Sequence, residues 1–189
     1  MIWPSLELNL ITYLLMPESH ISRSLSPTPL GEMLVLCSEK GLRGCWFLGQ
    51  SHFPKDAFNF NESQTAKSTQ IHQAVSHQLA LYFSNQIDKF DICLDLDNEG
   101  TPFQKEVWHV LTSIPYGATL SYSTIAQKIN RPNAVRAVGS AIGRNPISVI
   151  IPCHRVIGAN GSITGYAGGI ERKRSLLFLE GHQNTKHAQ

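Results

Sequence analysis

The feature that most constrains the fold is a change of charge and periodicity near residue 100. Residues 1–100 carry 6 Lys and Arg against 11 Asp and Glu, whereas residues 101–189 carry 10 against 3. A chain of 189 residues suffices for one large domain or two small ones. We therefore predict an N-terminal domain over 1–97, a C-terminal domain over 101–181 and a polar tail over 182–189, and we expect polyanions to meet the basic half.

The N-terminal half has the pattern of a small mixed α/β domain. Two apolar segments around Ser38–Gly41 predict a β-hairpin, and helical spacing of apolar residues predicts a helix over 65–84. The stretch 22–29 is rich in proline and serine and is expected to be a loop. The expected strands are 6–10, 33–37, 42–48 and 92–96.

Helix signals are strong after the break. Thr101 suits an N-cap, Pro102 suits the first helical position, and Gln104 completes a capping box. Shorter helices over 123–129 and 134–142 follow, and their spacing matches a helix-turn-helix. The fold class is therefore α+β, with a helical, winged-helix-like C-terminal domain.

The helix over 134–142, which Asn133 is expected to cap, has a face of small side chains. The residues expected to face the core are Ala134, Val135, Ala137, Val138, Ala141 and Ile142, and those expected to face outward are Arg136, Gly139, Ser140 and Gly143. Such a face fits either tight packing against another helix or close approach to a DNA groove. The basic charge of this half favours DNA, and we take this segment as the recognition helix.

Reactive groups are concentrated at Pro152-Cys153-His154-Arg155-Val156. A lone cysteine is often a small core residue, but basic neighbours stabilise the thiolate and indicate a nucleophile. In an extended segment, adjacent side chains point to opposite faces, so His154 need not touch the sulfur.

Two loops and a helix follow the reactive segment. Asn160-Gly161 predicts a hairpin between strands over 155–159 and 162–166. Residues 165–169 form a glycine-rich loop, and a last helix is expected over 170–179. Glu180 at its end is either a solvated surface residue or a carboxylate that orients a histidine.

The sequence resembles the O6-alkylguanine-DNA alkyltransferases, also called methylated-DNA-protein-cysteine methyltransferases. Residues 101–181 match this family closely, whereas residues 1–100 share only a loose α+β pattern. The shared motifs are Pro152-Cys153-His154-Arg155-Val156, Thr101-Pro102-Phe103-Gln104, Val107-Trp108, Ile114-Pro115, Ser121-Tyr122, Arg136-Ala137-Val138-Gly139, Asn145-Pro146, Gly165-Tyr166 and Glu180-Gly181.

The resemblance implies a direct-reversal DNA repair protein that binds the minor groove, flips the damaged base and moves its alkyl group irreversibly to Cys153. It implies that His154 takes the thiol proton through a water, that Glu180 orients the imidazole, and that Asn145 braces the turn and the histidine network. Tyr122 would promote base rotation and donate toward N3 of the base. The remaining implied residues are Arg136, which enters the base stack, Ala137, Gly139 and Ser140 for DNA, and Val156, Tyr166 and Ala167 for guanine.

The expected partner is double-stranded DNA containing alkylated guanine. We expect no metal or organic cofactor, because side chains supply the nucleophile, the base and the proton donor. The candidate zinc ligands Cys37, Cys45, His52, His72 and His77 lack the close paired spacing of common zinc motifs. Activity on O4-alkylthymine and cooperative assembly on DNA are left open for a protein expected to be a monomer.

The sequence also bears on the location of the protein and leaves two alternative functions. The absence of an apolar run, of a basic leader and of paired cysteines predicts an intracellular protein, cytoplasmic or, in a eukaryote, nuclear. The rivals are an alkyltransferase-like protein that binds damage without repairing it and a helix-turn-helix regulator. Both predict reversible DNA binding only, and neither requires Cys153.

Overall fold

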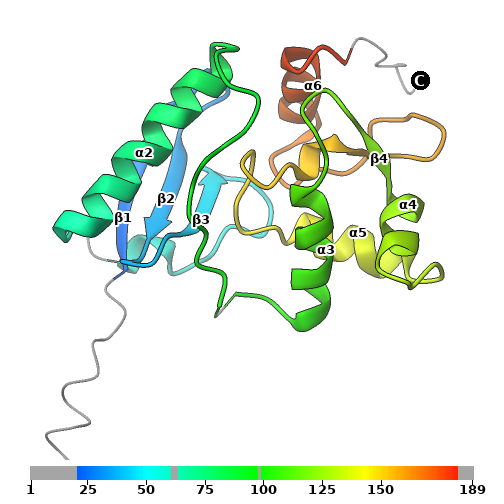
Figure 1. Cartoon of the computed structure of the whole chain (residues 1–189), viewed down its shortest axis with the longest axis horizontal. Helices are drawn as coiled ribbons and strands as arrows, with labels where there is room; N and C mark the ends of the chain where they lie inside the picture. Colours follow the sequence, from blue (N-terminus) through cyan, green and yellow to red (C-terminus); the bar gives the residue numbers. More distant parts are fainter. Residues whose placement is uncertain (1–20, 61–63, 98, 183–189) are drawn as a thin grey trace, which may run out of the picture.

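An antiparallel sheet with one covering helix forms the N-terminal part of the computed structural model, which describes residues 21–60, 64–97 and 99–182 (Figure 1). Strands β1 (Ser22–Ser26), β2 (Met33–Cys37) and β3 (Leu42–Phe47) are neighbours in that order, and α2 (Ala66–Phe83) packs on β1 and β2. The predicted hairpin and helix are confirmed. The strand expected over 6–10 and the tail residues 183–189 lie outside the described residues.

The predicted loop over 22–29 is wrong in its first five residues, which form β1. Ser22 pairs with Cys37 and Ser26 pairs with Met33, so this polar segment adds an edge strand to the sheet. Serine suits the position because α2 supplies partners: the Ser22 hydroxyl lies 3.1 Å from Nε2 of His72. Serine-rich composition therefore indicated a loop where tertiary hydrogen bonds stabilise a strand.

The predicted strand over 92–96 is also wrong. This segment forms one isolated parallel bridge, between Leu42 and Leu94, with the Leu42 amide donating to the Cys93 carbonyl and the Asp95 amide donating to the Leu42 carbonyl. Both of these backbone hydrogen bonds are made by Leu42, the first residue of β3. Alternating apolar residues thus mark an extended segment that packs on the core without joining the sheet.

Most elements of the C-terminal part are helices, whereas the N-terminal part adds to its sheet and α2 only a short 3₁₀ helix, η1 (Ala57–Asn59), which precedes α2. The capping box is confirmed, since the Thr101 hydroxyl accepts from the Gln104 amide and the Gln104 side chain accepts from the Thr101 amide. The elements are α3 (Pro102–Thr112), β4 (Leu120–Ser121), α4 (Tyr122–Lys128), α5 (Val135–Gly143), η2 (Cys153–Arg155), β5 (Val156–Ile157) and α6 (Ile170–Leu179).

Helices α4 and α5 form the predicted helix-turn-helix. Asn130 adopts a left-handed φ of 56°, which reverses the chain between them. Two details of the prediction are wrong. Ala134, with no side-chain cap, occupies the N-cap position assigned to Asn133. Val135 and Ala137 are exposed, because the buried stripe of α5 is narrower and consists of Val138, Ala141 and Ile142.

The segments around the reactive cysteine depart from the extended structure that was expected. Cys153–Arg155 is a 3₁₀ turn. A turn does form at Asn160-Gly161, with the Gly161 amide donating to the Gly158 carbonyl, but residues 162–166 form no strand. Instead β5 pairs in parallel with β4, with Val156 opposite Leu120. The partner of β5 is therefore β4, which is distant in sequence, and not the segment 162–166 that follows the turn at Asn160-Gly161.

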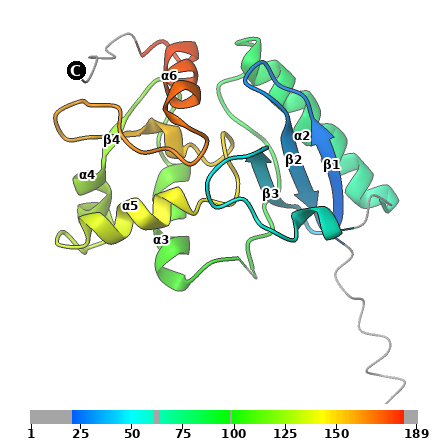
Figure 2. The same ribbon diagram turned by 180° about the vertical axis from the view of Figure 1, so that it is seen from behind.

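One hydrophobic core crosses both parts of the molecule. Met33 and Tyr82 from the sheet part belong to the same buried cluster as Trp108 and Leu176 from the helical part. The segment after β3 lies beside the loop that leads into α6 (Figure 2), and the Ser51 amide donates to the Ala167 carbonyl.

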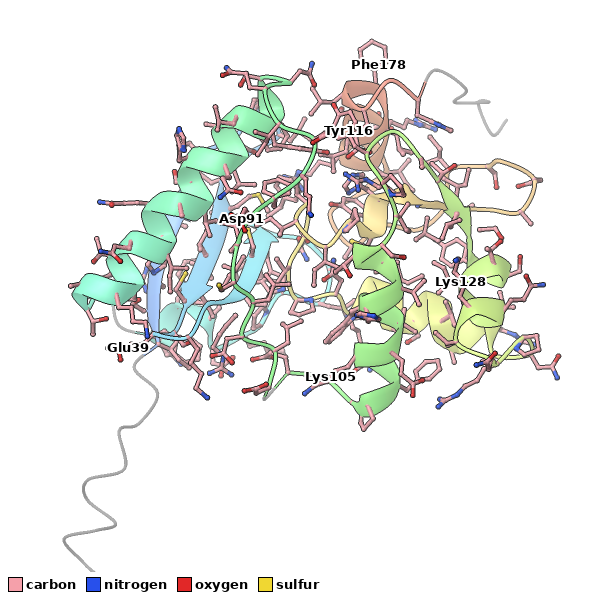
Figure 3. All side chains as sticks on the ribbon, viewed as in Figure 1. Glu39, Asp91, Lys105, Tyr116, Lys128 and Phe178 are labelled. Atoms are coloured by element: carbon pink, nitrogen blue, oxygen red, sulfur yellow. The ribbon has the colours of Figure 1, made fainter. Side chains whose placement is uncertain are left out.

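The surface keeps the charge division seen in the sequence. Glu39 and Asp91 belong to the sheet part, whereas Lys105 and Lys128 project from α3 and α4 (Figure 3). Within the described ranges, no helix combines the length and apolar character needed to cross a bilayer.

Candidate active site

Cys153 sits at the first position of η2 with 4% of its surface exposed. The side-chain amide of Asn145 donates to its sulfur at 3.1 Å and to the Ile151 carbonyl at 2.8 Å. The Asn145 carbonyl oxygen accepts from the Ile147 amide at 3.0 Å. Asn145 therefore holds the turn and the sulfur together. Its described contacts go to the thiol rather than to His154.

The thiol of Cys153 is neutral at rest. Burial raises its pKa, and this effect exceeds the opposing effects of the Asn145 hydrogen bond and the Lys173 ammonium. The expectation that neighbouring Arg155 stabilises the thiolate needs correction, because the Arg155 guanidinium turns away to Glu180 and to the Ile114 carbonyl. A reaction at this sulfur requires a base.

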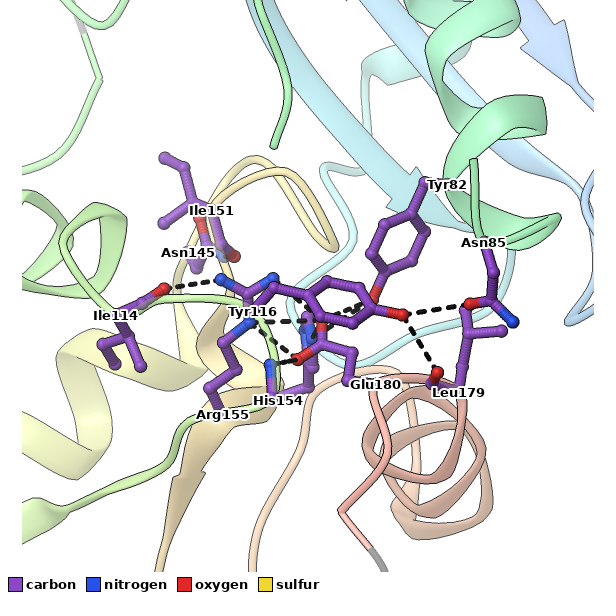
Figure 4. Close-up of polar contacts among 11 residues, drawn as sticks. Tyr82, Asn85, Ile114, Tyr116, Asn145, Ile151, His154, Arg155, Leu179 and Glu180 are labelled. Carbon is purple, nitrogen blue, oxygen red and sulfur yellow. Dashed lines mark hydrogen bonds and ion pairs between the residues drawn. The ribbon is translucent and has the colours of Figure 1, made fainter. Parts of the chain in front are cut away.

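A buried carboxylate, Glu180, lies at the end of α6 and collects donors from three directions (Figure 4). Its Oε1 accepts from Nε2 of His154 at 2.9 Å, from the Tyr82 hydroxyl at 2.6 Å and from Nη2 of Arg155 at 2.8 Å. Its Oε2 accepts from Nε of Arg155 at 2.9 Å and from the Gly117 amide at 3.2 Å. Of the two alternatives for Glu180, the structure supports contact with a histidine.

The charge state of Glu180 determines the tautomer of His154. Burial alone raises the pKa of this carboxyl, but hydrogen bonds from His154, Arg155 and Tyr82 outweigh it and lower the pKa to about 2. An ionised carboxylate only accepts hydrogen bonds, so Nε2 of His154 carries the proton and Nδ1 is bare. This Nδ1 is buried and has no hydrogen-bond partner among the described residues.

The imidazole of His154 is therefore a neutral base. Burial lowers its pKa, and this outweighs the opposite effect of the nearby Glu180 carboxylate. A neutral ring with a free Nδ1 is able to accept a proton near neutral pH. His154 directly follows Cys153 in the same buried 3₁₀ turn, so the base and the nucleophile belong to one short element.

Cys153 opens into a cavity of about 430 Å³, within the usual range for small-molecule sites. The Tyr122 hydroxyl donates to the Thr164 carbonyl at 3.1 Å, across the glycine-rich loop. Gly165, next to Thr164, adopts a left-handed φ of 44°, a backbone conformation that favours glycine. The lining residues are Ser51, His52, Tyr122, Gly139, Ile142, Gly143, Cys153, Thr164, Gly165, Tyr166 and Ala167.

Comparison with known proteins identifies the family. Residues 21–96 match the ribonuclease-like domain of 6-O-methylguanine DNA methyltransferase, and residues 102–182 match the DNA binding domain of the same family. A methylated-DNA-protein-cysteine methyltransferase of Methanosarcina acetivorans is 45% identical over 82% of this chain and 94% of its own. The chain belongs to the 6-O-methylguanine DNA methyltransferase family. The resemblance and fold class inferred from sequence are thereby confirmed.

Two further relatives agree with this methyltransferase assignment. The methylated-DNA-protein-cysteine methyltransferase of Salmonella typhimurium is 42% identical over 82% of this chain and 92% of its own. The crystal structure of the Mycobacterium tuberculosis OGT in complex with DNA is 40% identical. It superposes with a TM-score of 0.73 over 85% of this chain and 92% of that one.

Residues assigned from the methyltransferase resemblance fall into two groups. Tyr122, Tyr166 and Ala167 line the cavity with Cys153, while His154 and Glu180 are buried and are not among its lining residues. Val156 is buried, and its carbonyl accepts from the Lys173 ammonium. The second group lies on α5: Arg136, Ala137 and Ser140 are exposed, and Gly139 faces Tyr122, whose ring would lie 3.7 Å from an added Cβ.

Sequence reasoning missed Lys173 as a residue of this methyltransferase site. Its side chain is fully buried, and its ammonium donates to the carbonyls of Val156 at 2.5 Å, Thr164 at 2.6 Å and Gly165 at 3.1 Å. Burial lowers its pKa to about 8. Lys173 lies among other charged residues at the start of α6, where its sequence neighbours do not distinguish it. A signal was available only in its helical phase, one turn before the buried Leu176 and Leu177.

Tyr82 was also missed, because it lies in the N-terminal half and was counted as an apolar residue of a helix.

The structure also bears on the candidate metal ligands of the N-terminal half. Cys37 and His72 meet at 3.6 Å between the sheet and α2. In the part of the chain that the structure describes, no three His, Cys, Asp or Glu side chains gather to hold a metal ion.

Proposed function

We propose that this protein repairs DNA by direct reversal, moving the alkyl group of O6-alkylguanine in double-stranded DNA to its own Cys153. One observation carries the proposal. A buried thiol opens into a cavity of about 430 Å³, and the ionised Glu180 holds the neutral His154 as a base behind it. Family membership gives this geometry its reaction class.

The proposed transfer is an in-line displacement. Nδ1 of His154 accepts the thiol proton through a water, and the thiolate of Cys153 attacks the alkyl carbon. The new S–C bond forms as the C–O6 bond breaks, and the electron pair remains on guanine. The Tyr122 hydroxyl leaves the Thr164 carbonyl and donates its proton at N3 of the base. Solvent then restores the proton to Tyr122 and removes the extra proton from His154.

Access to O6 requires that the base leave the duplex. In a base pair, O6 of guanine faces the major groove and its neighbours are stacked, so a buried thiol reaches the alkyl carbon only after extrusion. We assign α5 to the minor groove, where its small residues, the exposed Ala137 and Ser140 and the half-buried Gly139, permit close approach. Arg136 takes the place of the flipped base.

The cavity residues hold the extruded guanine. The Tyr166–Ala167 segment and the carbonyls of Cys153 and Val156 are the proposed contacts. A thioether is not hydrolysed by any of these groups, so each chain accepts one alkyl group. We propose that the monomer needs no cofactor and that the units 1–97 and 101–181 work together.

Mass spectrometry tests the transfer directly. Duplex DNA with one O6-methylguanine is incubated with excess protein, and the protein is then denatured and digested. We expect one methyl group per chain, on the peptide that contains Cys153, and unmodified guanine in the DNA. The Cys153→Ser variant is the control and should remain unmodified. Damage-dependent binding without any methylated peptide would instead favour an alkyltransferase-like protein, and damage-independent binding would favour a regulator.

Binding to undamaged duplex DNA should weaken as salt rises. Residues 101–189 carry 10 Lys and Arg against 3 Asp and Glu, and each phosphate contact releases counterions. For about four contacts, the slope of log K against log salt is expected near −4. Fluorescence anisotropy over a salt series measures it. A flat response would contradict electrostatic binding by this half.

A further inference from the structure

Tyr82 brings the N-terminal part of the fold into contact with the buried carboxylate. It lies on α2 and is fully buried, and its hydroxyl donates to Oε1 of Glu180 at 2.6 Å (Figure 4). Its ring is fixed by edge contacts with Phe83 and Tyr116 and by a tilted contact with Phe90. A rigidly held hydroxyl thus reaches across the domain boundary to the carboxylate beside His154.

We propose that Tyr82 is a positioning residue that sets the orientation and basicity of Glu180 toward His154. Thiol activation in the C-terminal part then depends on a side chain of the N-terminal part. The inference rests on the proposed role of His154 as the base for Cys153, and it goes beyond that role by assigning a function to α2.

Three side chains donate hydrogen bonds to Oε1 of Glu180. This oxygen accepts from the imidazole of His154, from Arg155 and from Tyr82, whose hydroxyl also lies 3.5 Å from Nε2 of the ring. Arg155 donates to both carboxylate oxygens, Oε1 and Oε2. It therefore fixes the plane of the carboxylate, but it does not favour negative charge on one oxygen over the other. The tyrosine hydroxyl is the added donor on the histidine side.

Removal of this donor has a defined electrostatic consequence. A carboxylate with fewer hydrogen bonds holds its charge less stably and attracts a proton on the neighbouring imidazole more strongly. The pKa of His154 should therefore rise when Tyr82 loses its hydroxyl. Burial and the nearby Glu180 charge raise the pKa of Tyr82 itself, so its hydroxyl stays a donor over the working pH range.

Other charged groups around this pair do not imitate the effect. The groups facing it are Arg155 from η2, Lys173 from α6 and Tyr116 from the segment after α3. Burial lowers the pKa of Lys173 to about 8, which places its titration on the alkaline side. Burial raises the pKa of Tyr116, so Tyr116 also does not titrate in acid. The acid limb, which is the fall of the transfer rate as the pH is lowered, therefore reports on protonation of His154.

The test compares Tyr82→Phe with Tyr116→Phe. Tyr116 contacts the Tyr82 ring, but its hydroxyl donates to Asn85 and to the Leu179 carbonyl instead of Glu180. Single-turnover methyl transfer from O6-methylguanine DNA is measured from pH 5 to 9. We expect Tyr82→Phe to move the acid limb upward by about half a pH unit, which lowers the rate about threefold on that limb and less than about twofold near pH 7. Tyr116→Phe should leave the limb in place.

A second substitution retains the hydroxyl and changes its strength as a donor. Fluorotyrosine placed at position 82 makes the hydroxyl a stronger donor and should move the acid limb to lower pH. It covers the case in which Tyr82→Phe does not fold. If the rate of Tyr82→Phe falls but its acid limb does not move, Tyr82 has a merely structural role and the proposal is overturned. The proposal is also overturned if Tyr82→Phe has the same rate and the same acid limb as the wild type.

Separate results contradict the proposed function and the role of Tyr82. If wild-type protein transfers no methyl group, the proposed function is wrong. If transfer occurs but Glu180→Gln keeps the wild-type rate and limb, the proposed proton route is wrong and the inference falls with it. If Glu180→Gln is slow while Tyr82→Phe matches wild type, the inference alone is wrong.

Discussion

Replacing Glu180 with alanine is expected to destabilise the fold by about 3 to 5 kcal/mol and to slow methyl transfer about 100-fold or more. The substitution leaves the buried Arg155, a residue that is 6% exposed, without the carboxylate partner of its guanidinium. It also removes the acceptor that holds His154 with Nδ1 bare. Denaturant unfolding and single-turnover transfer measure the two effects on the same preparation.

Glu171→Ala is the matched control on the same helix. Glu171 pairs with Arg174 one turn away, and its side chain is 84% exposed, so the loss is expected to stay within about 0.5 kcal/mol, with an unchanged transfer rate. Equal stability losses in the two variants would contradict the assignment of Glu180 as a buried charge partner.

The same carboxylate gives the stability a defined pH dependence. Its pKa in the folded protein is about 2, below the ordinary value of 4.5, so its contribution is complete above pH 4.5 and is lost as the pH falls toward 2. Over this interval the wild type should lose on the order of 3 kcal/mol from this group, which Glu180→Ala lacks. The stability difference between the two proteins should therefore narrow in acid.

Local signals predicted the helices of this fold well. The capping box at Thr101 and the helical period over 65–84 each depend on residues within one or two turns, so the sequence contains the whole interaction. Strand partners were harder. Leu94 packs beside β3 and Val156 pairs with Leu120, and both outcomes depend on chain segments that are far apart in sequence.

The candidate site divides in the same way. Cys153 and His154 are adjacent in sequence and could be recognised as a reactive segment, whereas Asn145 was assigned from the family resemblance. Tyr82 and Lys173 could not, because their roles depend on burial created by tertiary packing. A lysine becomes a site residue only when three carbonyls surround it, and no composition or spacing encodes that arrangement.

Arg136→Ala should reduce repair of O6-methylguanine in duplex DNA by about 100-fold, equivalent to ~2.7 kcal/mol. Extruding a base costs a few kcal/mol of stacking and pairing, and an inserted side chain offsets part of that cost. Arg136 is exposed in the first turn of α5, where it is free to enter the groove. Reaction with free O6-benzylguanine needs no extrusion and should stay within about twofold of wild type.

Arg144→Ala separates insertion from simple charge. Arg144 is the exposed C-cap residue of the same helix, so its removal subtracts the same charge from the same half of the protein. Both variants should weaken salt-dependent binding to undamaged DNA, because phosphate attraction depends on charge. A large loss of duplex repair with intact free-base reaction should occur for Arg136→Ala only. If Arg136→Ala lost both reactions equally, α5 would support the cavity rather than the flipped duplex, and the assignment of Arg136 to the base stack would have to be abandoned.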